Sequence, residues 1–193
     1  MAGPGHLTLT PEIERFRNVF EQLSADGDAL TDPLTDEQFT WRPSVTVWSI
    51  AQCLDHLNAA ARFYLPCLDE GIADAIRRGL YTEGPFSYSW LGRFLVYIME
   101  PPSRLRARTK PAMQPGGPRP RKDIMAAFRA YQVQYIDRLH QANGLDLSRA
   151  RVRTPIAGWL WMPLGSGFAL MAAHERRHLA QARRLMAAPG FPG

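Results

Sequence analysis

GSGFALMAAHERRHLAQARRLMA, residues 165–187, carries the clearest helical period in the chain. At about 100° per residue, apolar side chains such as Met171 and Leu185 gather on one side of this segment, and its arginines gather on the other. Pro189 and Gly190 follow it, and both residues are typical of the end of a helix. We therefore expect an amphipathic helix over residues 165–187, with one face buried against other helices.

Three further segments repeat apolar residues with the helical period. Thr10 and Pro11 suit the cap and first position of a helix, and Ser49 and Gln52 have the spacing of a capping box that opens another. Pro66 is expected to kink this second helix or to end it early. The expected bundle helices are residues 11–26, 49–69, 121–142 and 165–187.

Residues 70–120 are expected to form an irregular connection between the second and third of these helices. Within it we expect a helix over 88–100, stopped by Pro101 and Pro102. Residues 101–122 contain six prolines, seven lysines or arginines and no acid, which predicts an extended surface segment. The favoured interpretation is a solvated connection, and the alternative is a cover over a cavity that attracts an anionic cosubstrate.

The number and order of these helices predict the fold class. Four principal helices with one long connection indicate an all-α protein, a four-helix bundle with a long crossover, as a single domain over 1–193. A short helical turn is expected at 35–38. No internal repeat or alternating strand pattern competes with this interpretation.

Composition and charge narrow the function classes. The longest apolar run, 90–99, is interrupted by Arg93, so we expect no membrane span. Residues 1–11 show no secretory leader, and the expected location is cytoplasmic. Cys53 and Cys67 would lie roughly 21 Å apart on one helix, which fits a reducing compartment. The formal net charge of +5 is interpreted as a basic solvated surface.

Three histidines lie on the expected helices with a spacing that suits a metal ion. His174 and His178 are four residues apart, so they lie one helical turn apart on the same side, at the border of the buried face. His56 points inward from the second helix by the same angular argument. Three neutral imidazoles with open coordination positions indicate a catalytic type of site for a first-row divalent metal. The alternative is a set of hydrogen-bonded core histidines.

Glu175 completes a His-Glu-x-x-His string, the pattern of zinc peptidases. No further histidine, cysteine or acid follows His178, so the third peptidase ligand is missing and we do not assign that activity. Glu175 falls within the apolar arc of its helix and needs a partner there. A buried salt bridge or a backbone donor is the favoured interpretation, and a catalytic base is the alternative.

Two segments resemble the DinB-like superfamily, also described as DinB/YfiT-like metalloenzymes. The first runs from Trp41-Arg-Pro43 through Trp48-Ser-Ile-Ala-Gln-Cys-Leu-Asp-His56-Leu, and the second from Pro163 through Gln181. The resemblance implies a four-helix bundle with a long crossover and frequent dimerisation. It also implies a metal held by one histidine of the second helix and two of the last, which here are His56, His174 and His178.

The resemblance further implies a thiol-dependent activity, because family members with assigned activity are mostly transferases that use mycothiol, bacillithiol or glutathione. The expected cofactor is a divalent metal ion, with zinc or nickel favoured and iron or manganese as alternatives. The ion would favour the thiolate of a low-molecular-weight thiol, or activate a water, for attack on an electrophilic small molecule.

A noncatalytic bundle that acts by self-association or protein binding is the rival hypothesis, so whether the chain is an enzyme stays open. A homodimer is expected, and DNA binding is ranked last because no basic groove interleaved with aromatic residues is evident. Four aromatic residues are expected either to line the substrate side or, as the favoured interpretation, to pack in the core or an interface. They are Trp48, Phe63, Trp159 and Trp161.

Overall fold

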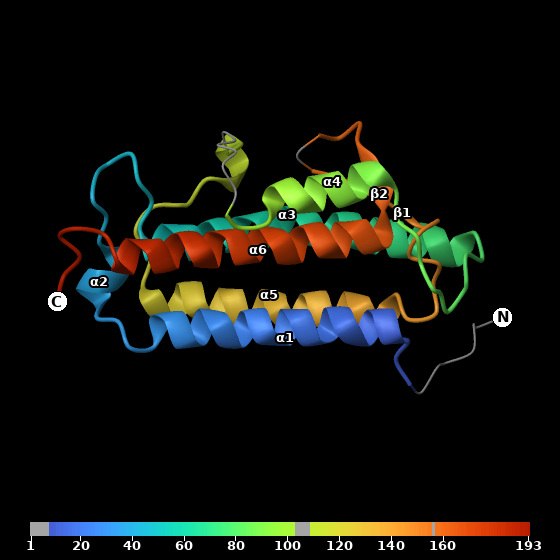
Figure 1. Ribbon diagram of the computed structural model, residues 1–193, viewed down its shortest axis with the longest axis horizontal. Helices are drawn as coiled ribbons and strands as arrows, with labels where there is room; N and C mark the ends of the chain where they lie inside the picture. Colours follow the sequence, from blue (N-terminus) through green and yellow to red (C-terminus); the bar gives the residue numbers. More distant parts are fainter. Residues whose placement is uncertain (1–7, 103–108, 156) are drawn as a thin grey trace.

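Four long helices lie side by side in the computed structural model, which describes residues 8–102, 109–155 and 157–193 (Figure 1). They are α1 (Pro11–Thr31), α3 (Ile50–Arg77), α5 (Arg121–Gln141) and α6 (Leu164–Met186). In Figure 1, α3 and α6 form one layer and α1 and α5 the other. Each helix of one layer packs against its neighbour in the other, so the core fills the space between the layers. The predicted all-α class is confirmed.

Aromatic rings fill much of this core. Phe20 of α1 stacks on Tyr135 of α5 with 4.8 Å between ring centroids, and Phe16 packs against Phe168 of α6 at 6.0 Å. Gly27 of α1 lies directly against the buried ring of Phe128, because a Cβ there would meet the ring at 2.5 Å. The missing side chain therefore lets α1 and α5 approach closely.

Two helices are longer than predicted. α1 continues to Thr31 rather than ending at 26, because Gly27 packs against α5 instead of stopping the helix. α3 continues to Arg77, so the expected end at 69 is wrong. Pro66 has no N–H to donate to the carbonyl of Arg62, four residues earlier. Both residues are exposed, so this carbonyl lies on the side of α3 that water reaches.

The connections contain the two short helices predicted from the sequence and a pair of strands that was not predicted. The short helix α2 (Asp36–Thr40) has the expected capping box, and α4 (Trp90–Met99) packs along α6 (Figure 1). Two strands, β1 (Arg151–Arg153) and β2 (Trp161–Pro163), form an antiparallel pair just before α6. Each strand is too short to show a period in the sequence. No helix in the described part of the chain combines the length and hydropathy needed to cross a membrane.

Replacing Gly27 with Ala should destabilise the fold by about 1–3 kcal/mol, because the new methyl group overpacks against Phe128. In an unobstructed helix the same change would stabilise by about 0.5–1 kcal/mol, which gives the prediction a definite sign. Urea unfolding measures the difference. The penalty should shrink in a Phe128→Leu background, and an equal penalty in both backgrounds would contradict the proposed contact.

Candidate metal centre

Three histidines from two neighbouring helices form the candidate site. His56 lies near the start of α3, and His174 and His178 lie on successive turns of α6, which packs against α3. The start of α3 is fixed by a capping box in which the Ser49 hydroxyl accepts from the Gln52 amide at 3.1 Å and the Gln52 side chain accepts from the Ser49 amide at 3.0 Å. This cap sets the rotation of the first turns and hence the direction of His56.

The three imidazoles converge as the helix faces predicted. One ring nitrogen from each of His56, His174 and His178 lies within 4.8 Å of the other two, and Nε2 of His56 is 3.1 Å from Nε2 of His174. Tetrahedral zinc with bonds of about 2.0–2.1 Å would hold two nitrogens roughly 3.4 Å apart. The cluster therefore has the size that one divalent ion requires.

Burial keeps these rings neutral. Desolvation, together with the neighbouring imidazoles, lowers the pKa of His174 to about 3 and that of His178 to about 2. Desolvation also lowers the pKa of His56, partly offset by the Met113 carbonyl and the Asp55 carboxylate. A neutral imidazole has a free lone pair and is the form that ligates metals, so the rings are in the ligand form at neutral pH.

The hydrogen bonds around the rings also suit a cation. Nδ1 of His56 lies 2.6 Å from the Met113 carbonyl oxygen, which can only accept, so Nδ1 carries the proton and the Nε2 lone pair faces His174. Nδ1 of His178 is buried without a hydrogen-bond partner. The Trp48 ring packs against His56 and His178, with centroid distances of 5.0 and 5.9 Å. The residues present therefore fit a bound divalent cation.

Comparison with known families agrees with these features. The profile of the DinB superfamily matches residues 19–182, a range that includes all three histidines. The chain belongs to the DinB superfamily. Comparisons with characterised proteins and with solved structures found no match.

Glu175 of this DinB-superfamily chain lies between the layers and lacks the partners predicted for it. It is buried, its Oε2 has no hydrogen-bond partner, and desolvation raises its pKa to about 8. The side chain of Gln132 on α5 lowers this pKa somewhat. Burial, and after it the Glu175 carboxyl, raises the pKa of Tyr135 on the same helix. Among the described residues Glu175 forms no ion pair, because Arg176 next to it pairs with Glu100 instead. The predicted salt bridge is therefore wrong.

Of the four aromatic residues singled out in the sequence, Trp48 is placed at the histidines. Trp159 and Trp161 are exposed, at 81% and 52%, so they do not pack in the core, and the interface named beside the core stays a prediction. Phe63 is partly buried, with the guanidinium of Arg62 over its ring. Trp48 is thus the residue of the four whose ring contacts the histidines.

Most described residues of the basic segment are exposed, as its composition predicted, but contacts with α3 hold it in place, which the composition did not predict. It contains a 3-10 turn, η1 (Pro111–Met113), and the Met113 side chain is buried. The segment is bound to Asp55 as well as to His56, contacts that proline and arginine content does not signal. Residues 103–108 of the predicted segment lie outside the described residues.

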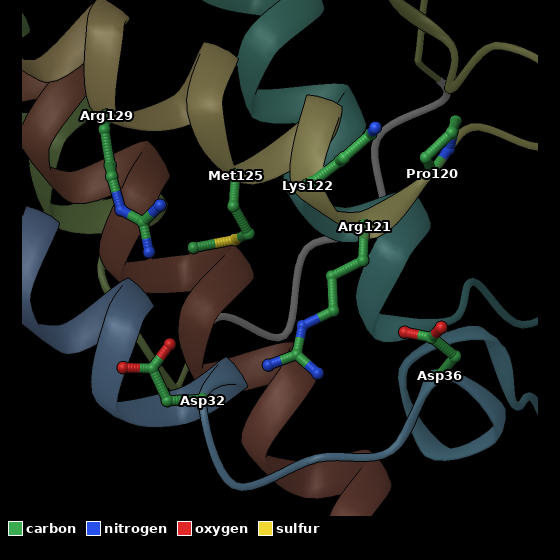
Figure 2. Close-up of a pocket in the computed structure, with 7 residues that line it drawn as sticks. All are labelled: Asp32, Asp36, Pro120, Arg121, Lys122, Met125 and Arg129. Carbon is green, nitrogen blue, oxygen red and sulfur yellow. The ribbon is translucent and has the colours of Figure 1, made fainter.

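A cavity of about 410 Å³ opens elsewhere, where the end of α1 and α2 meet the start of α5 (Figure 2). Figure 2 shows Arg121 extending from α5 toward the loop between Asp32 and Asp36. Its guanidinium donates to the carbonyls of Thr31 and Leu34, so this cation already has partners. The cavity is lined by Asp32, Asp36, Pro120, Arg121, Lys122, Met125 and Arg129. None of these is one of the three histidines, so this cavity is separate from the candidate metal centre.

Glu175→Gln should remove a pH-dependent loss of stability. A glutamate in the unfolded chain ionises with the ordinary pKa of 4.5, whereas the pKa of the folded one is about 8, so the folded state retains a proton between these values. The free energy of unfolding of wild type, measured relative to that of Glu175→Gln at the same pH, should therefore fall as pH rises from 5 to 9, by an amount on the order of a few kcal/mol. The lowered pKa values of the three histidines add a rise in stability between pH 5 and 7 that both proteins share and that cancels in this difference.

Urea unfolding of chelator-treated protein at pH 5, 7 and 9 measures this effect. The difference between wild type and Glu175→Gln should change over the range, while Glu21→Gln, which changes an exposed carboxylate, should follow the wild type. Parallel profiles for wild type and Glu175→Gln would show that the Glu175 carboxyl is not desolvated.

Proposed function

We propose that the protein is a divalent-metal-dependent enzyme whose ion is held by His56, His174 and His178. The convergence of their ring nitrogens within 4.8 Å carries the proposal, and their neutral state and burial support it. Three protein ligands leave at least one position for water or substrate, as in catalytic zinc sites. Zinc or nickel is the proposed ion, and iron or manganese also suits imidazole ligands.

The proposed reaction is attack by a low-molecular-weight thiol, or by water, on an electrophilic small molecule. When bound, the ion would lower the pKa of a coordinated thiol or water and thereby supply the nucleophile. His56, held by the Met113 carbonyl, would keep its lone pair directed at the site, and the Trp48 ring would shield one side from solvent. The thiol assignment rests on family resemblance. A cytoplasmic location is proposed with it, and the two free cysteines, Cys53 and Cys67, fit a reducing compartment.

Glu175 is proposed as a general base. Its position on the α6 turn between the two ligand histidines and its unpartnered Oε2 support this role. A base must be ionised, and a pKa of about 8 keeps the Glu175 carboxyl mostly protonated at neutral pH, so Glu175 would act as a base only as the pH approaches and passes that value.

Elemental analysis of protein purified without an affinity tag tests the proposed site. Wild type should contain near-stoichiometric zinc, nickel, iron or manganese, and His174→Ala should lose it because two ligands hold such ions poorly. His140→Ala, which removes an exposed histidine at the end of α5, is the matched control and should keep the metal. Metal-free wild type, or equal metal in His174→Ala, would overturn the proposal.

The same variants test whether the proposed nucleophile is a thiol or a water molecule. Mycothiol, bacillithiol or glutathione should raise the melting temperature of metal-loaded wild type and His140→Ala, but not that of His174→Ala. A metal-loaded protein that responds to none of these thiols would favour the hydrolase form of the proposal.

We also propose self-association through α4, the function favoured by the exposed side of this helix. Trp90, Phe94 and Tyr97 lie on one side of α4 at i, i+4 and i+7 and are 77%, 50% and 77% exposed. α4 covers α6 from the outside, so this side faces away from the bundle (Figure 1). Aromatic clusters of this kind are enriched at protein interfaces, and a second copy of the chain is the proposed partner.

Trp90→Glu together with Tyr97→Glu should raise the dimer dissociation constant by about 30-fold or more, the effect of losing an interface residue worth about 2 kcal/mol. Light scattering coupled to size exclusion measures the molar mass over a range of concentrations. Val133→Glu, an exposed apolar position on α5, should leave the mass unchanged. A monomeric wild type would contradict the proposal.

A further inference from the structure

A short stretch of the connecting segment crosses α3 beside His56. η1 ends at Met113, whose side chain is only 5% exposed and whose carbonyl oxygen lies 2.6 Å from Nδ1 of His56. This contact is made by the backbone, so the position of the carbonyl depends on how the whole stretch 113–119 is held. What anchors the stretch therefore controls the imidazole.

Asp55 is that anchor. Its Oδ2 accepts from the backbone amide of Gly116 at 2.7 Å, and its Oδ1 accepts from Nη1 of Arg119 at 3.0 Å. The Asp55 side chain is only 10% exposed, and hydrogen bonds to a buried carboxylate are about twice as strong as neutral ones. Both carboxylate oxygens are thus used to hold the segment against α3.

The tautomer of His56 explains why this matters. A neutral imidazole carries its proton on either nitrogen, and only the form with the proton on Nδ1 offers Nε2 as a ligand. A carbonyl fixed at Nδ1 selects that form. Second contacts of this kind, made to a ligand rather than to the ion, typically change metal affinity about 10–100-fold when lost.

We propose that Asp55 is a positioning residue of the metal site, which holds residues 113–119 so that the Met113 carbonyl fixes the His56 tautomer and ring orientation. The inference rests on the proposed metal-binding function. Asp55 does not serve as a ligand itself, because it precedes His56 by one residue on α3, about 100° around the helix, and both its oxygens are already bonded.

Competition between the protein and a chromophoric chelator for Zn²⁺ tests this role. Asp55→Ala should raise the Zn²⁺ dissociation constant about 10–100-fold, and Asp55→Asn, which retains an acceptor for Gly116, should recover part of the loss. Arg119→Ala should weaken binding in the same direction and keeps the test available if Asp55→Ala does not fold. Asp69→Asn is the matched control, because Asp69 lies on the same helix and pairs with Arg138 instead.

A second readout needs no metal. Nitrogen-15 NMR of the imidazoles in chelator-treated wild type should show His56 protonated on Nδ1 alone, and Asp55→Ala should show a mixture of tautomers. Unchanged Zn²⁺ affinity with an unchanged tautomer in Asp55→Ala would overturn the inference and leave the proposed function standing. Wild type that binds no Zn²⁺ would instead overturn the proposed function, while a tautomer change in Asp55→Ala would still support the positioning of His56.

Discussion

Desolvation of three imidazoles between α3 and α6 is the constraint on which the site depends. The two helices pack closely enough that His174 and His178 cannot hold a proton at neutral pH. The same packing leaves Nδ1 of His178 buried without a hydrogen-bond partner. A buried polar cluster of this kind is costly for an empty core and becomes favourable around a cation.

The inward direction of each histidine could be predicted because it follows from helical geometry, and the meeting of His56 with the other two was implied by the resemblance to the DinB-like superfamily. The spacing of His174 and His178 fixes one face of α6, and the capping box at Ser49 fixes the start of α3. The inward direction of Glu175 followed from the same arithmetic. The residues around Glu175 could not be predicted, because they come from α5. The hydrophobic period of a helix does not tell how that helix is rotated against its neighbour.

Other features had no readable signal. Pro66 normally indicates a helix end, and only the exposure of that side of α3 explains why the helix continues. The Met113 contact uses a backbone carbonyl, which every residue has, so side-chain chemistry could not reveal it. Proline and arginine content predicted a solvated stretch, whereas the two bonds to Asp55 tie it to the core.

The separation of His56 and His174 along the chain has a consequence for the stability of the metal-loaded protein. The two residues are 118 positions apart, and their nitrogens are 3.1 Å apart. An ion shared between them would join α3 to α6 and close a loop of more than a hundred residues, which removes conformational freedom from the unfolded chain much as a cross-link does. A bound ion would therefore make the protein more resistant to denaturants and to proteases than the metal-free protein.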